Sequence, residues 1–283
     1  MNDPGVTVGI IAGSGELPLH IARALSRSGR RLFVAGLKNS ALPELKDTSW
    51  ETEWVDFFRL GDLLSSLKNA GVSEVILAGH VDHRGIFQAE RFDDRMRSFL
   101  RSLGERGGSS ILSAFVLLLT REGYGVPSLL DVVPELVPSE SFTAGPNPGP
   151  AATADLSLGW AMARQLADLD IGQTVVVKSG AVVAVEGMEG TDKAVRRALD
   201  LAGSGLTVVK RAAGDHDFRF DVPTIGKRTI EVLSGGKGGS VVLETGRCFI
   251  LGREEVISLC DRTGVSLVVC REDENGAVSW ASN

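Results

Sequence analysis

The sequence predicts an α/β protein with two domains, in which a Rossmann-like parallel sheet comes first and a second α/β domain follows. Continuous apolar runs alternate with helical patterns through the first half, which is typical of parallel strands covered on both faces. A segment rich in proline and glycine then separates the two halves. The chain has 283 residues, 43% hydrophobic and 23% charged, and is long enough for two globular cores.

The first predicted strand leads into a glycine loop. Val6–Ala12 is a continuous apolar run, and Gly13-Ser14-Gly15 follows it directly. Pro18 suits the first turn of a helix that we expect to reach about Ser28, and the next strand is expected at Arg31–Leu37. Backbone amides at such a helix start can bind phosphate. The loop therefore predicts a phosphate or nucleotide site, and a tight turn that binds nothing is the alternative.

The loop does not fit a nicotinamide dinucleotide well. The dinucleotide fingerprint requires a third glycine where this chain has Pro18. It also requires an acidic residue at the end of the second strand, and residues 36–39 (Gly-Leu-Lys-Asn) contain none. A phosphate or a different nucleotide remains the expected ligand.

The alternation of strands and helices continues to residue 78. We expect a strand at Trp54–Phe58, a helix at Gly61–Asn69 and a strand at Glu74–Ala78. Gly79-His80 and His83 follow the last strand, at the sheet edge where ligands gather, so they should lie near the glycine loop. The two histidines either bind phosphate or a metal ion, or are ordinary polar residues of a loop.

A long helical region and a linker complete the first half. Residues 87–122 predict two helices broken near 104–108, and 126–136 returns the chain along the sheet. Residues 138–153 contain four prolines and two glycines among serines and threonines, which indicates a linker. The predicted domains are therefore 1–137 and 154–283.

The second half is organised around a hairpin and an acidic turn at residues 174–192, after a helix predicted at Asp155–Asp168. Val175–Val177 and Val182–Val185 are β-branched runs joined by Ser179-Gly180, which predicts a hairpin. Three carboxylates follow within seven residues, beside glycines that allow a tight turn, and a helix is expected from Lys193 to Ala202. The turn is either a site for a metal ion or a sugar hydroxyl, or an ordinary capped turn. The three carboxylates are Glu186, Glu189 and Asp192, and the two glycines are Gly187 and Gly190.

Asp221 marks a second polar centre. We expect it to end a short strand, with Thr224 or Gly226 starting a helix that runs to about Leu233. A carboxylate beside a helix start, with Lys210 and Lys227 nearby, suits a metal ligand or a proton acceptor near phosphate. The alternative is that it merely caps the helix. Further strands are expected at 240–244, 248–251 and 265–270, with a helix at 254–262 and a frayed end from Arg271.

Charge, apolar runs and cysteines exclude other classes. A net charge of -6 without a long basic block argues against nucleic acid as a partner. No secretory signal is visible, and the run Ile111–Leu119 is too short to span a bilayer, so we expect a cytoplasmic protein. Cys248, Cys260 and Cys270 lack zinc-site spacing and are expected to be reduced, buried thiols.

Four segments resemble one known family. They are IAGSGELP at 11–18, LAGHV at 77–81, VVVKSGAVVAVEGMEGTD at 175–192 and DVPTIG at 221–226. In this order they are similar to the LpxI family, the UDP-2,3-diacylglucosamine pyrophosphatases of lipid A biosynthesis. The resemblance implies a ligand held between the two domains and water attack on the α-phosphorus. The products would be UMP and lipid X, and the cofactor would be Mg²⁺ or another divalent cation.

The resemblance also implies roles for individual residues. The catalytic set would be Asp221, Lys210 and Thr224, and the metal ligands would be Asp221, Glu189 and Asp192. Lys178 and Lys210 would offset charge on the phosphoryl oxygens. The substrate-binding set would be Gly13, Ser14, Gly15, Leu17, Gly79, His80, Lys178, Glu186, Gly187, Gly190 and Thr191.

Two departures keep other functions open. Many relatives carry Gly-Asp-Asp where this chain has Gly108-Ser109-Ser110, and often Gly-Arg-Val where it has Gly79-His80-Val81. The Ser109-Ser110 departure motivates one alternative, a non-catalytic nucleotide- or lipid-binding module. The other alternative is a nucleotide-dependent oxidoreductase that uses the first domain in the ordinary dinucleotide manner. Because the implied substrate is a lipid, we expect an apolar groove for its acyl chains and peripheral contact with the inner membrane. A homodimer is left open.

Overall fold

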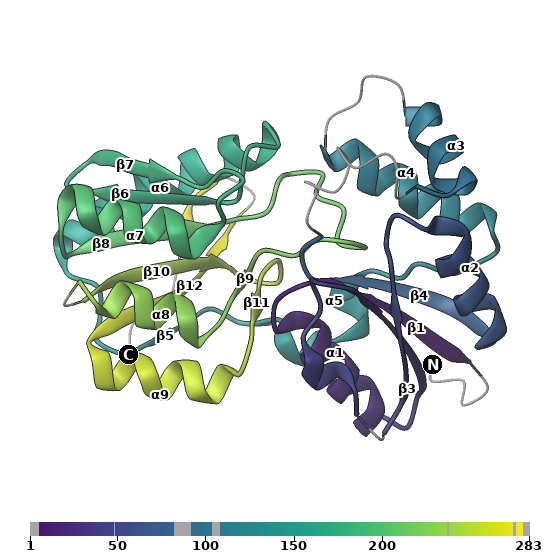
Figure 1. Cartoon of the computed structure of the whole chain (residues 1–283). Coiled ribbons are helices and arrows are strands. Elements are labelled where there is room, and N and C mark those ends of the chain that lie inside the picture. The colour runs from purple at the N-terminus through teal and green to yellow at the C-terminus, as the bar shows by residue number, and fades with distance from the viewer. Residues whose placement is uncertain are drawn as a thin grey trace. The chain divides into compact units, whose positions relative to one another are not determined.

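The computed structural model describes residues 6–47, 49–81, 92–103, 108–236, 238–273 and 276–279, apart from the side chains of residues 108–110 (Figure 1). His83 lies outside the described residues. The chain divides into two compact units. Unit 1 comprises Met1–Val133 and Asp217–Asp221, and unit 2 comprises Pro134–His216 and Val222–Asn283.

Unit 1 contains a four-stranded sheet in which every pairing is parallel, in the order β3-β2-β1-β4. This confirms the predicted Rossmann-like sheet. The direction in which strands are added changes after β3: β2 and β3 lie on one side of β1, and β4 lies on its other side. The strands are β1 (Thr7–Ala12), β2 (Arg31–Leu37), β3 (Glu51–Val55) and β4 (Val72–Ala78).

The helices of unit 1 bury their apolar stripes against this sheet and one another. Leu63 and Leu67 of α2 share a core with Phe99 of α3 and Phe115 of α4. The region predicted to contain two helices therefore does so in its described part. The helices of unit 1 are α1 (Leu17–Arg27), α2 (Leu60–Asn69), α3 (Asp94–Leu103), α4 (Gly108–Arg121) and α5 (Leu129–Val132), with a short 3₁₀ turn at Pro43–Leu45. A second 3₁₀ turn, Pro134–Leu136, begins unit 2.

Unit 2 is built on a seven-stranded mixed sheet. β8, β10 and β12 are parallel, and β6 is antiparallel to both β8 and β7, so β7 runs in the direction of β8. A separate parallel pair joins β9 (Thr224–Ile225) and β11 (Phe249–Ile250). The strands of the sheet are β5 (Phe142–Ala144), β6 (Thr174–Lys178), β7 (Ala181–Val185), β8 (Leu206–Lys210), β10 (Gly239–Glu244), β12 (Val265–Glu272) and β13 (Val278–Ser279).

Helices cover both faces of this sheet (Figure 1). Alternate residues point to opposite faces of a strand, so Val209 packs with Trp160 of α6 while Val208 packs with Val195 of α7. α6 (Pro150–Asp168) lies on one face, and α7 (Thr191–Ala202), α8 (Lys227–Ser234) and α9 (Arg253–Thr263) lie on the other. None of the described helices is long and apolar enough to cross a bilayer.

The predicted linker at 138–153 is wrong. β5 pairs antiparallel with β12 from within this segment, and α6 already begins at Pro150. Thr143 and Ala144 are buried, and Ser266 donates its hydroxyl proton to the Pro146 carbonyl over 2.6 Å. The prolines and glycines mark turns on either side of a short strand, so the segment belongs to the body of unit 2.

Two predictions near the end of the chain are also wrong. β12 continues through Glu272, and β13 pairs with it, so the chain beyond Arg271 is not simply frayed. Asp221 does not end a strand, because residues 217–221 form a turn-rich segment that returns to unit 1. There the Phe218 carbonyl accepts a hydrogen bond of 2.8 Å from the Leu129 amide, and Phe220 packs against the core.

The three cysteines are free and buried, as predicted. Burial raises the pKa of each thiol to about 12. Cys248, Cys260 and Cys270 therefore act as small apolar core residues.

Candidate active site

The carboxyl ends of β7, β8, β10 and β12 meet at one edge of the unit 2 sheet, because these strands run in the same direction. Each strand delivers a charged residue there. Open α/β sheets bind ligands at this edge. The residues are Glu186, Lys210 with Arg211, Glu244 and Glu272.

Lys210 lies at the centre of a buried polar cluster. Lys210 is 4% exposed, and its ammonium donates to Thr191 Oγ1 at 2.9 Å and to Thr174 Oγ1 at 3.2 Å. Its third contact is Glu186 Oε2 at 3.3 Å. An ammonium has three donors, so these three acceptors satisfy it completely.

Glu186 remains ionised in this cluster. Burial alone would raise the pKa of its carboxyl, but the charge of Lys210 and hydrogen bonds from Thr174, Thr191 and Lys210 outweigh that effect. The pKa of Glu186 therefore lies below its usual value. Its other oxygen accepts the Thr191 hydroxyl proton at 2.8 Å. Glu186 thus fixes the first residue of α7 in place.

Asp192 ties the start of α7 to the start of α8. One of its oxygens accepts from Thr229 Oγ1 at 3.1 Å, and the other lies 2.9 Å from Arg228 Nε. Gly226 is the N-cap of α8, which is one of the two starts that the sequence predicts. Gly190 precedes α7 with a φ of +84°, a conformation that favours glycine.

Glu189 lies in the turn between β7 and α7, and its carboxylate contacts both that turn and the helix. It accepts from Arg197 at 2.7 Å and from the Gly187 amide at 3.1 Å. The Arg197 hydrogen bond is the main cause that lowers the pKa of this exposed carboxyl. The structure therefore brings together Glu186, Gly187, Glu189 and Thr191 in one turn, held by Lys210 and Arg197.

The predicted metal ligands are not gathered within one unit. Glu189 and Asp192 belong to unit 2, whereas Asp221 belongs to unit 1. Carboxylate oxygens suit Mg²⁺, but Glu189 and Asp192 are each paired with a guanidinium. In the described part of the chain, no three His, Cys, Asp or Glu side chains form a group that could hold a metal ion.

Lys178 lies away from the Lys210 cluster. It ends β6, whereas Thr174 begins that strand, and four residues of strand span about 13 Å. Its ammonium donates to the Ala202 carbonyl at the end of α7, where a cation interacts favourably with the helix dipole. Thr224 lies in β9 and donates its hydroxyl proton to the Val222 carbonyl at 2.7 Å.

A second buried network lies on the α6 face of the same sheet edge. Arg211 is 1% exposed, pairs with Glu244 at 2.9 Å and with Glu272, and its guanidinium carbon lies 3.9 Å from the Trp160 ring centroid. Arg164 also pairs with Glu244 at 2.9 Å. Sequence reasoning missed this network. The Lys210-Arg211 pair at the end of β8 was the available signal in the sequence. Adjacent strand residues point to opposite faces of the sheet, so the pair places one cation on each face.

In unit 1 the glycine loop and the end of β4 lie together, as predicted. The amides of Ser14 and His80 each donate to the carbonyl of the other, at 2.8 and 3.0 Å. A Cβ on Gly13 would lie 2.5 Å from the His80 oxygen, and one on Gly79 would lie 2.6 Å from the Ser14 oxygen. The bridge occupies the Ser14 amide, so the amides from Gly15 to Leu17 are those that a phosphate would use.

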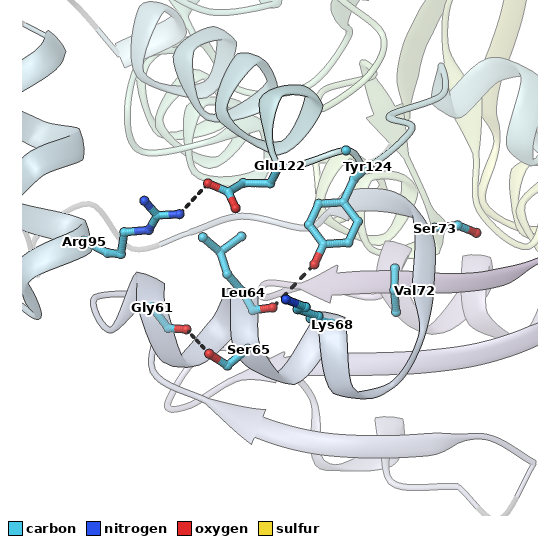
Figure 2. Close-up of a pocket in the computed structure, with 10 residues that line it drawn as sticks. Gly61, Leu64, Ser65, Lys68, Val72, Ser73, Arg95, Glu122 and Tyr124 are labelled. Carbon is cyan, nitrogen blue, oxygen red and sulfur yellow. Dashed lines mark hydrogen bonds and ion pairs between the residues drawn. The ribbon is translucent and has the colours of Figure 1, made fainter.

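A pocket of about 600 Å³ lies elsewhere in unit 1, along α2 and the end of α4 (Figure 2). None of the predicted site residues lines it. Arg95 and Glu122 form an ion pair at its rim, and the Tyr124 hydroxyl donates to the Leu64 carbonyl at 3.4 Å. These contacts engage the polar groups of Arg95, Glu122 and Tyr124 within unit 1, and no predicted site residue is near them, so the two sheet edges described above are the better candidates for the active site.

Comparisons with known proteins agree with this division. The LpxI N-terminal domain matches residues 7–136, and the LpxI C-terminal domain matches residues 139–268. A relative from Caulobacter vibrioides, named UDP-2,3-diacylglucosamine pyrophosphatase LpxI, is 32% identical over 269 residues. The alignment covers 91% of this chain and 95% of the relative. The protein belongs to the LpxI family.

Proposed function

We propose that the protein hydrolyses the pyrophosphate of UDP-2,3-diacylglucosamine in lipid A biosynthesis, by attack of water on the α-phosphorus. The products are UMP and 2,3-diacylglucosamine 1-phosphate, or lipid X. The observation that carries the proposal is the similarity to a named UDP-2,3-diacylglucosamine pyrophosphatase across both domains. The cluster of charged groups and helix starts at the unit 2 sheet edge supports it, because phosphoryl transfer depends mostly on positioning and electrostatic stabilisation.

Asp221 is the proposed catalytic carboxylate, and Thr224 stands three residues beyond it in the same segment. Mg²⁺ or another divalent cation is the proposed cofactor, and the ligands that the family resemblance implies are Asp221, Glu189 and Asp192. A bound cation would neutralise charge on the phosphoryl oxygens. For Glu189 and Asp192 to serve as ligands, each would exchange its guanidinium partner for the metal ion, and Arg197 and Arg228 would then be available to anionic oxygens.

Lys210 is proposed as a positioning residue. Its ammonium is buried and satisfied by Thr174, Glu186 and Thr191, so direct contact with phosphate would require breaking that set. It holds Glu186 and the start of α7 in place instead. The turn of Glu186, Gly187, Gly190 and Thr191 would then present its backbone and side chains to the sugar.

The nucleotide part of the substrate is assigned to the glycine loop of unit 1. The hydrogen bonds between Ser14 and His80 hold the glycine loop against the end of β4. The amides from Gly15 to Leu17 take no part in those two bonds.

The test is product analysis by mass spectrometry after incubation with UDP-2,3-diacylglucosamine and Mg²⁺ in ¹⁸O water. The expected result is lipid X without label and UMP carrying one ¹⁸O. Label in lipid X would keep the hydrolase and overturn attack at the α-phosphorus. Binding without turnover across several divalent cations would favour the non-catalytic binding module.

A further inference from the structure

One loop of the chain leaves unit 2, carries Asp221 and returns to unit 2. It begins after Lys210 at the end of β8 and ends where β9 begins, so it comprises residues 211–223. Its middle part, Asp217–Asp221, belongs to unit 1, whereas both of its ends belong to unit 2. We call residues 211–223 the Asp221 loop.

The first end of the Asp221 loop is held by Arg247. The guanidinium of Arg247 donates to the Ala213 carbonyl and, at 3.3 Å, to the Gly214 carbonyl. The Gly214 amide donates in turn to Asp168, the last residue of α6, over 2.8 Å. The Arg247 side chain is 29% exposed, so these hydrogen bonds are partly shielded from water. One cation therefore fixes two consecutive carbonyls at the point where the loop leaves unit 2.

The second end of the loop is held by the residues that follow Arg247 directly. The Phe249 amide donates to the Pro223 carbonyl over 2.8 Å, and β11 pairs with β9 from there (Figure 1). Between these two contacts, the Cys248 thiol donates to the Lys210 carbonyl at 3.7 Å, just before the loop begins. Three successive residues, Arg247, Cys248 and Phe249, therefore contact the chain at both ends of the Asp221 loop.

Glu244 orients Arg247 for this contact. Glu244 Oε2 lies 3.5 Å from Arg247 Nε, and the two residues are three apart in the turn that follows β10. The other oxygen of Glu244 lies 2.9 Å from both Arg164 and Arg211. Glu244 therefore keeps two cations when Arg247 is replaced, and a substitution at this position removes the contact to the loop without leaving a buried charge unpaired.

We propose that Arg247 is a positioning residue for the reaction, because it fixes one end of the loop that carries Asp221. This inference rests on the proposed function, in which Asp221 is the catalytic carboxylate. Arg247 has no assigned contact with the substrate and acts through the Ala213 and Gly214 carbonyls. A reacting group that is misplaced by about 1 Å can lose about 100-fold in rate, so the path of this loop matters for turnover.

The test compares Arg247→Met with Arg271→Met by hydrogen–deuterium exchange and by steady-state kinetics. Arg271 is the matched control, because its guanidinium donates to a backbone carbonyl outside the Asp221 loop, that of Ser139 at 3.1 Å. In R247M, the amides of residues 212–221 should exchange about tenfold faster, since a hydrogen bond from a charged donor contributes stability of that order. With UDP-2,3-diacylglucosamine, R247M should lower kcat about tenfold and keep KM within about twofold, whereas R271M should change neither.

Arg247→Lys should recover part of both effects, because an ammonium can still donate to one of the two carbonyls. Exchange in the rest of unit 2 should be the same in R247M and R271M, which separates release of the loop from a general loss of folding. Unchanged exchange of residues 212–221 in R247M, or a kcat equal to that of R271M, would overturn the proposal. A wild-type protein that hydrolysed no UDP-2,3-diacylglucosamine would instead reject the proposed function, and exchange would still decide whether Arg247 holds the loop.

Discussion

Lys210 Nζ and Glu186 Oε2 lie 3.3 Å apart at the carboxyl edge of the unit 2 sheet, where the Lys210 side chain is buried and the Glu186 side chain is largely covered, with 5% and 12% of their surfaces exposed. The pair joins β8 to the turn before α7. Its geometry leads to predictions on stability that do not depend on the reaction.

Lys210→Met should destabilise the protein strongly. The substitution leaves the Glu186 carboxylate buried without its cation, which costs about 3–5 kcal/mol when one partner of a buried pair is removed. Lys210→Met combined with Glu186→Gln should recover part of the loss. Urea unfolding of the two single variants and the double variant measures the coupling. A loss below about 1 kcal/mol for Lys210→Met would show that the pair is not buried in solution.

Stability should fall in acid partly through Glu186. Its pKa is lower in the folded than in the unfolded protein, so its contribution is complete above the unfolded value of about 4.3 and is lost as the pH falls through the folded pKa. The free energy of unfolding, measured between about pH 6 and pH 3, should therefore drop less in Glu186→Gln than in the wild-type protein. Equal slopes would remove Glu186 from the acid response.

Gly79→Ala should cost more stability than Gly71→Ala. Both glycines have positive φ, +84° and +66°, so both variants share the backbone penalty. Only the Cβ at position 79 meets backbone, 2.6 Å from the Ser14 oxygen, whereas nothing lies within 4 Å of the one at position 71. The difference should be about 1–3 kcal/mol in denaturant unfolding. Equal costs would mean that the two loops are not in contact.

Asp221→Asn should lower turnover of UDP-2,3-diacylglucosamine by about 100-fold or more, as removal of a catalytic proton acceptor does. Asp217→Asn is the matched control, because Asp217 lies on the same segment and pairs with Arg219 at 2.6 Å. Kinetics at saturating substrate and circular dichroism separate catalysis from folding. Equal turnover in the two variants would reject the role assigned to Asp221.

The sequence predicted the features that depend on local pattern. Apolar runs and helix signals located β1, α1 and β2 to within one residue or so, and the rule for carboxyl ends predicted that Gly13 and His80 lie together. The hairpin of β6 and β7 followed from its β-branched runs and the Ser179-Gly180 turn. These elements are determined by neighbouring residues in the chain, so one sequence suffices.

Features that depend on distant partners were not predictable in this way. β5 pairs with β12 across more than a hundred residues, and nothing in its Pro- and Gly-rich flanks indicates that pairing. Arg211 is buried because Glu244, Glu272 and Trp160 surround it, whereas composition alone places an arginine on the surface. Lys178 and Lys210 look alike in sequence, and only strand direction separates them.

The return of Asp217–Asp221 to unit 1 has a consequence for the gene. The Leu129 amide donates to the Phe218 carbonyl, and Phe220 packs against the core of unit 1, so a fragment ending at Val133 would lack both contacts. A single break in the coding sequence therefore cannot yield two whole units. Recombination that exchanges the second half of the chain at one breakpoint would therefore remove this segment from unit 1.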